Sequence, residues 1–199
     1  MDLFPTLVSA GWASGVNAYL TVALLSLLGR AGWGAVPDEL QSNGVLTVAL
    51  ALFAIEFVAD KIPYVDNAWD AVHTAVRPSI ASAIGVAFAG DTGSTGLDQA
   101  LAGGGSGAMA LASHAVKAGL RLGVNASPEP FSNIVISLTE DGLVAGVVAL
   151  ALEHPVPAAV IAAVLLLAGA GLVVVLMVRV RRALSALRDR WGRPPPARS

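Results

Sequence analysis

The chain has 199 residues, a formal net charge of −2, a hydrophobic content of 55% and only 13% charged residues, with a mean hydropathy of +0.71. Soluble domains carry about 25% charged residues, so this composition indicates a membrane protein. The absence of cysteine excludes disulfides, thiolate metal sites and thiol nucleophiles. No run alternates apolar and polar residues as a transmembrane strand would, so we predict an all-α transmembrane bundle of about six helices.

The first apolar run, 3–29, is long enough to cross a bilayer, which takes about 20 helical residues. No Lys or Arg precedes it and no small-residue cleavage pattern ends it, so we expect a permanent span rather than a signal peptide. Gly11 and Gly15 form a GxxxG pair that allows close packing with a neighbouring helix or a second copy of the chain. Asn17 lies near the middle, where an interhelical hydrogen bond is the simpler interpretation and a substrate contact the alternative.

A second helix is predicted over 44–62, ending in the charged stretch EFVADKIPYVDNAWDAVHTAVR of residues 56–77. Its Glu56 and Asp60 are four residues apart and therefore share one helix face. Because the rest of the chain is mostly Ala, Val, Leu and Gly, this stretch is either the functional site or an internal skeleton of ion pairs.

A third helix is predicted over 67–89, kinked or broken near Pro78. Asp70, His73 and Arg77 recur at steps of three and four and form a polar stripe on it. The pattern leaves open whether residues 64–78 span the membrane or lie at its surface.

A loop at 90–98 precedes a fourth helix that is predicted to end near Val124. His114, Lys117 and Arg121 repeat the spacing of the first stripe and form a second one.

The fifth helix is predicted over 131–152, with Glu140 and Asp141 near its centre. Neighbouring acids point to different helix faces and cannot form a general acid and base pair unaided.

The sixth helix, 156–182, is apolar until Arg179 and is expected to face lipid. Seven of the 12 Lys and Arg residues lie at or after Arg179. We therefore predict one transmembrane domain over 1–182 and a basic amphipathic, then disordered, cytoplasmic tail over 183–199 that contacts anionic lipids. Counting back from this tail with the positive-inside rule places both termini in the cytoplasm.

These polar residues support several functional hypotheses. The candidate substrate- or ion-binding residues are Asn17, Glu56, Asp60, Asp70, His73, Arg77, His114, Lys117, Arg121, Glu140 and Asp141. Intramembrane ionisable groups are functional candidates by default, so the leading hypothesis is a transporter or channel for an ion or small polar solute, through a charged cavity open to the cytoplasm. In this hypothesis His73 and His114 titrate or relay protons. A network of purely structural ion pairs is the competing interpretation.

Two further classes remain as alternatives. A membrane enzyme acting on a phospholipid or isoprenoid phosphate would suit the His, acid, Arg and Lys content, but the chain lacks HExxH, a P-loop and a complete GxSxG, since GGSGA at 104–108 ends in Ala. The second alternative is an accessory or structural membrane subunit that docks through the GxxxG faces. No metal or cofactor is predicted, and nothing favours nucleic acid, because orientation and lipid contact explain the basic tail.

The segments GVNAYL (15–20), EFVADKIPYVDNAWDAVHTAVRP (56–78), SHAVKAGLRLGVNASPEPFSN (113–133) and SLTEDG (137–142) resemble a family of small bacterial multi-pass membrane proteins. The family is catalogued as domain of unknown function 4126. The resemblance implies an integral membrane domain and carries no assigned activity. We predict a location in the bacterial inner membrane.

Overall fold

A computed structural model describes residues 2–62, 64–125 and 130–191. Within them the chain forms six α-helices and one short 3₁₀ helix, which confirms the predicted all-α bundle. The helices are α1 (Leu3–Arg30), α2 (Asn43–Ala59), α3 (Val65–Asp91), α4 (Leu97–Val124), α5 (Pro130–Glu153) and α6 (Pro155–Trp191), with η1 at Asp38–Gln41. By length and composition α1, α5 and α6 could each cross a membrane, while α2 is a shorter apolar helix.

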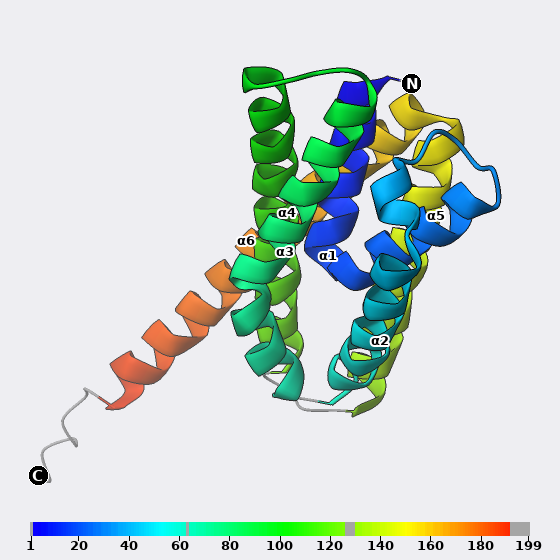
Figure 1. Ribbon diagram of the computed structural model, residues 1–199. Helices are drawn as coiled ribbons and strands as arrows, with labels where there is room; N and C mark the ends of the chain where they lie inside the picture. The colour runs from blue at the N-terminus through cyan, green and yellow to red at the C-terminus, as the bar shows by residue number, and fades with distance from the viewer. Residues whose placement is uncertain (1, 63, 126–129, 192–199) are drawn as a thin grey trace, which may run out of the picture.

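Helix α1 is broken in its middle. Asn17 has non-helical backbone angles, φ −149° and ψ 99°, and Figure 1 shows α1 running from the N-terminus toward the centre of the bundle and then turning aside. Each half has about 14 residues and rises only about 21 Å, less than the roughly 30 Å of a bilayer core. The halves therefore form a re-entrant helix that does not cross the bundle.

Both ends of α1 lie at the same end of the bundle. Leu3 shares a groove with Asp98, at the start of α4, and Gly34, just after α1, lies against the carbonyl of Leu152 near the end of α5. We call the other end of the bundle, where α2 ends at Ala59 and α3 begins at Val65, the charged end.

The start of α1 and the end of α6 consequently lie toward opposite ends of the bundle (Figure 1). Helix α6 runs in the same direction as α4, because Val173 packs on Gly119 and Leu176 on Gly123, and so it runs toward the charged end, with its last part diverging from the bundle (Figure 1). The prediction of two cytoplasmic termini assumes that the first helix crosses the membrane, and the break at Asn17 bears on that assumption without testing it.

Helix α3 continues through Pro78 without a non-helical residue, so the broken helix of this bundle is α1 rather than α3. Its first half belongs to the bundle rather than to a surface segment, because Asp66, Asp70, His73 and Arg77 are all buried. The basic amphipathic segment predicted after residue 182 is the last part of α6, and the predicted disorder of 192–199 lies outside the described residues.

Small residues bring the helices of this chain close together. A Cβ added to Gly11 or Gly15 of α1 would collide with backbone atoms of Ser106 or Ala110 of α4. Gly107 of α4 lies in the same way against Ser82 of α3. The GxxxG face of Gly11 and Gly15 is therefore occupied by a helix of the same chain.

Candidate functional site

Charged and polar side chains gather at the charged end, next to the break in α1. They come from the end of α2, the first half of α3, the second half of α4 and the first half of α5. We call this group the charged cluster, and its members are Asn17, Glu56, Asp60, Asp66, Asp70, His73, Arg77, His114, Lys117, Arg121, Asn125, Asn133, Glu140 and Asp141. It brings together all eleven residues proposed from the sequence, of which only Glu140 and Asp141 are not fully buried.

Arg77 is completely buried and connects α3 to three other helices. Its Nη2 donates to Glu56 Oε1 at 2.6 Å and lies 3.1 Å from Asp70 Oδ1. Its Nη1 donates to the carbonyl of Gly15 at 3.2 Å and to His114 Nδ1 at 2.6 Å. A buried guanidinium with this many partners is expensive to separate from them.

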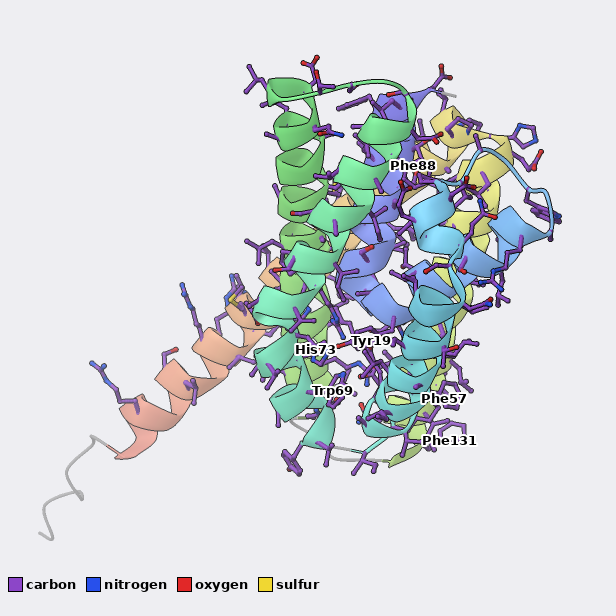
Figure 2. All side chains as sticks on the ribbon, viewed as in Figure 1. Tyr19, Phe57, Trp69, His73, Phe88 and Phe131 are labelled. Atoms are coloured by element: carbon purple, nitrogen blue, oxygen red, sulfur yellow. The ribbon has the colours of Figure 1, made fainter. Side chains whose placement is uncertain are left out.

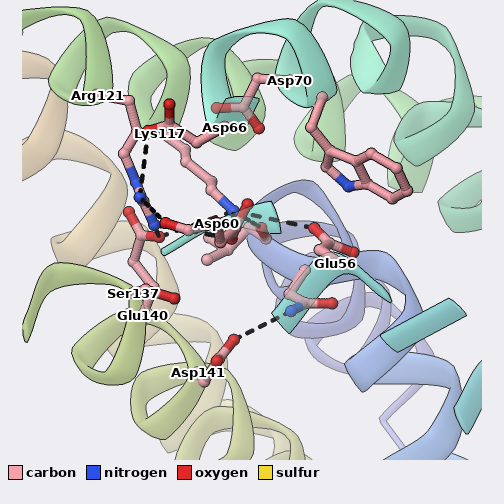
Figure 3. Close-up of polar contacts among 12 residues, drawn as sticks. Glu56, Asp60, Asp66, Asp70, Lys117, Arg121, Ser137, Glu140 and Asp141 are labelled. Atoms are coloured by element: carbon pink, nitrogen blue, oxygen red, sulfur yellow. Dashed lines mark hydrogen bonds and ion pairs between the residues drawn. The ribbon is translucent and has the colours of Figure 1, made fainter. Parts of the chain in front are cut away.

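Lys117 and Arg121 bind the acids of α2 and α5 from α4. Lys117 Nζ donates to Asp60 Oδ2 at 2.7 Å and to the carbonyl of Val16 at 3.0 Å. Arg121 donates to Glu140 Oε2 at 2.6 Å and to the backbone carbonyl of Asp60 at 2.7 Å. Figure 3 shows Asp60 between Lys117, Arg121 and Glu56, at the centre of the cluster.

The break in α1 is built into this network. In a continuous helix Leu20 N would donate to the carbonyl of Val16, but here it donates to Asn17 Oδ1 at 3.0 Å, so Asn17 caps the second half of the helix. The released carbonyls of Gly15 and Val16 accept instead from Arg77 and Lys117.

The electrostatics of the two broken ends match their surroundings. The carboxyl end of the first half carries partial negative charge and meets the cations Arg77 and Lys117. The amino end of the second half carries partial positive charge, and there Asn17 Nδ2 donates to the carboxylate of Asp141 at 3.0 Å.

Hydrogen bonding assigns opposite tautomers to the two histidines of the cluster. Arginine only donates, so His114 Nδ1 accepts from Arg77 and its Nε2–H points to the carbonyl of Asp70 at 3.0 Å. His73 Nδ1 lies 2.7 Å from the carbonyl of Trp69 and must donate, which leaves Nε2 to accept from the Tyr19 hydroxyl at 2.9 Å. Figure 2 places Trp69, His73 and Tyr19 together, and the Trp69 ring stacks on His73 with centroids 4.5 Å apart.

Three members of the cluster were missed by sequence reasoning: Asp66, Asn125 and Asn133. The fully buried Asp66 carboxylate accepts from Asn125 Nδ2 at 2.9 and 3.0 Å and lies 3.4 Å from Asn133 Nδ2. Asp66 lies four residues before Asp70 and extends the stripe of α3 by one turn. The predicted helix start at residue 67 excluded Asp66 from that stripe. The two asparagines are the first and last residues of the NASPEPFSN segment, residues 125–133.

The cluster has an excess of acid. It contains six carboxylates against the three bases Arg77, Lys117 and Arg121. A fourth base, Lys61, lies at the edge, where its Nζ donates to the carbonyl of Phe57 and lies 3.1 Å from the Phe57 ring centroid. Burial lowers the pKa of Lys61, which lies in the turn after α2.

Several carboxylate oxygens of the cluster have no hydrogen-bond partner among the described residues: Glu56 Oε2, Asp60 Oδ1, both oxygens of Asp70, and Asp141 Oδ2. Buried carboxylate oxygens are costly to leave unpaired. All three buried bases are held by carboxylates, although the Nε atoms of Arg77 and Arg121 also have no hydrogen-bond partner among the described residues. The cluster therefore favours a cation or a proton, because an anionic solute would have to displace the acids that bind Arg77, Lys117 and Arg121.

Open space adjoins the cluster on one side. A pocket of about 120 Å³ between α1, α4, α5 and α6 is lined by Lys117 and Glu140 among mainly apolar side chains. Among the described residues, no group of three or more His, Asp or Glu side chains has the arrangement of a metal site.

The fold and the site define a helical membrane protein with a re-entrant broken helix above a buried cluster of ionisable groups. The chain belongs to the family described as Domain of unknown function (DUF4126), whose model matches residues 5–176. This confirms the resemblance seen in the sequence. No curated protein and no solved structure was found to match the chain.

Proposed function

We propose that this protein is a small transporter or channel for an ion or small polar solute, with the charged cluster as its binding site. The observation that carries the proposal is the break in α1, whose two ends are both directed at charged side chains of the cluster. Discontinuous helices with ends of this kind form the ion and substrate sites of many transporters. Irregular backbone at membrane depth is tolerated where protein or a cavity satisfies it.

The proposed setting is the bacterial inner membrane, with the charged end toward the cytoplasm. The last part of α6, which runs toward that end, suits anionic lipids because it carries Arg179, Arg181, Arg182 and Arg188. The re-entrant helix then starts and ends on the outer side. In this orientation residues 1–182 act as one transmembrane unit, and Arg121, Asp66 and the two asparagines are the cluster residues on its cytoplasmic side.

The alternatives fit the geometry less well. A lipid phosphate needs free cationic groups, and the bases of the cluster are already bound to carboxylates. A purely structural network would satisfy all its acids, whereas oxygens of Glu56, Asp60, Asp70 and Asp141 have no hydrogen-bond partner among the described residues, although all of these acids except Asp141 belong to ion pairs.

The test is ion flux in proteoliposomes that contain the purified full-length chain. Movement of H⁺, Na⁺, K⁺ and Cl⁻ is recorded with ion-sensitive dyes for the wild type, for Glu140→Gln and for the matched control Glu153→Gln. Glu140 binds Arg121 in the cluster, whereas Glu153 is exposed at the end of the same helix. We expect flux of at least one ion in the wild type and the control, and a loss in Glu140→Gln. A folded wild type that moves none of these ions would contradict the proposal, and release of phosphate from added lipid phosphates would replace it with the enzyme.

A further inference from the structure

Asp141 is the isolated acid of the charged cluster. Each of the other five carboxylates, Glu56, Asp60, Asp66, Asp70 and Glu140, lies within 4.0 Å of an Arg or Lys nitrogen. Asp141 forms no such ion pair with any described residue. Its Oδ1 accepts from the neutral amide of Asn17, and its buried Oδ2 has no partner in the described part of the chain.

The charged groups that face Asp141 are bound to other partners. They are Lys117 on α4 and Lys61 and Asp60 after α2, while α1 contributes only Asn17. Lys117 is bound to Asp60 at 2.7 Å, and Lys61 Nζ is bound to the carbonyl of Phe57 and to Ser137 Oγ. On α5 itself, the neighbouring Glu140 is turned to Arg121.

Asp141 lies near the middle of α5, where the lack of a cationic partner disfavours its ionised form. It lies about 11 residues after the start of α5 and 12 before its end, roughly 17 Å from either end of the helix. An ionised carboxylate at such a depth is unfavourable without a cationic partner, whereas the protonated form is neutral and can donate a hydrogen bond.

We propose, on the basis of the transport function above, that the ion moved by the cluster is the proton and that Asp141 carries it. A proton arriving from water on one side forms an O–H bond at Oδ2, and the same bond breaks when the proton is released to water on the other side. The carboxylate is restored and no electrons are exchanged.

Asn17 couples this step to the backbone. Its Oδ1 caps Leu20 N while its Nδ2 binds Asp141 Oδ1, so one side chain contacts both the carboxyl group and the amino end of the second half of α1. The ionised carboxylate attracts this positive helix end, and protonation removes that attraction. The charge state of Asp141 is thereby connected to the packing of the re-entrant helix.

A hydrated metal cation fits Asp141 less well than a proton. A cation such as Ca²⁺ or Mg²⁺ takes six or more oxygen ligands. Asp141 has one hydrogen-bonding neighbour among the described residues, and it belongs to no group of acids and histidines with metal-site geometry there. A proton requires only the free Oδ2.

Two measurements on the full-length chain in liposomes test the proposal. Infrared difference spectra across pH detect the carbonyl stretch of a protonated carboxyl group without any need for transport. Proton uptake driven by a potassium diffusion potential is followed with an internal pH dye. The variants are Asp141→Asn, the carboxyl-preserving Asp141→Glu and, as a control, Asp91→Asn at the exposed end of α3.

We expect the wild type and Asp91→Asn to show the carboxyl band and proton uptake. Asp141→Asn should lose the band and fall to the uptake rate of protein-free liposomes, while Asp141→Glu should shift the band and keep uptake. An unchanged band in Asp141→Asn would overturn the assignment of the proton, even if flux of another ion upheld the proposed transport function. A band specific to Asp141 without any ion flux would overturn proton movement together with the transport function.

Discussion

Gly15 of α1 lies directly against Ser113 of α4, so close that a Cβ on Gly15 would overlap the Ser113 hydroxyl and the carbonyl of Ala110. The Ser113 hydroxyl in turn donates to the carbonyl of Trp12 at 2.9 Å. This contact holds the end of the first half of α1 against α4, within reach of Arg77 and Lys117. The position of the helix break therefore depends on the absence of one side chain.

Gly15→Ala should destabilise the protein by about 1–3 kcal/mol, because the added methyl group forces α1 away from α4. The measure is the free energy of unfolding in mixed detergent micelles. Gly104→Ala is the matched control, since a Cβ there meets nothing within 4 Å on an exposed face of α4, and alanine should be neutral or stabilise by up to about 1 kcal/mol. Equal effects of the two substitutions would show that α1 does not pack as described.

The buried pair of Arg77 and Glu56 allows a double-mutant cycle. Both side chains are 0% exposed and their nitrogen and oxygen are 2.6 Å apart. We expect Arg77→Gln and Glu56→Gln each to cost about 3–5 kcal/mol of unfolding free energy, because each leaves a buried charge uncompensated. The double variant should be less destabilised than the sum by about 0.5–3 kcal/mol.

The control for this cycle is Arg179→Gln on the exposed part of α6, which should change stability by less than about 0.5 kcal/mol. Additive single effects for Arg77 and Glu56 would mean that the two groups do not interact in the folded protein.

Residue spacing predicted which side chains share a helix face, but it could not predict their partners. Arg77 and the backbone of Asp70 in one stripe contact His114 in the other, a pairing that the spacing left open. The choice of Glu56 for Arg77 and of Asp60 for Lys117 depends on how far each helix slides along its neighbour. Only the folded bundle determines that register.

The break at Asn17 could not be predicted from local signals. An asparagine costs a helix well under 1 kcal/mol relative to alanine, so its presence does not mark a break. The break is stable because Arg77 and Lys117, distant in sequence, bind the released carbonyls. Pro78, which does carry a local signal, removes one backbone donor and leaves α3 helical.

The two histidines should show opposite tautomers at neutral pH. We expect the hydrogen on Nδ1 in His73, which faces the carbonyl of Trp69, and on Nε2 in His114, which accepts from Arg77 at Nδ1. Nitrogen-15 NMR of histidine-labelled protein in liposomes distinguishes the two forms, and His73→Gln and His114→Gln assign the signals. Finding His114 with hydrogens on both nitrogens would contradict its contact with Arg77.

The re-entrant α1 predicts that the two termini lie on opposite sides of the membrane. Because the chain has no cysteine, single cysteines report topology without background. Positions 2 and 95 lie at the end of the bundle opposite the charged end, and position 185 lies on the last part of α6, which diverges from the bundle; the substitutions are Asp2→Cys, Thr95→Cys and Ser185→Cys, all at exposed positions. In sealed vesicles, an impermeant maleimide should label positions 2 and 95 from one face and position 185 only from the other. Labelling of positions 2 and 185 from the same face would mean that the first helix crosses the membrane. The carbonyls of Gly15 and Val16 could then no longer both lie where Arg77 and Lys117 bind them.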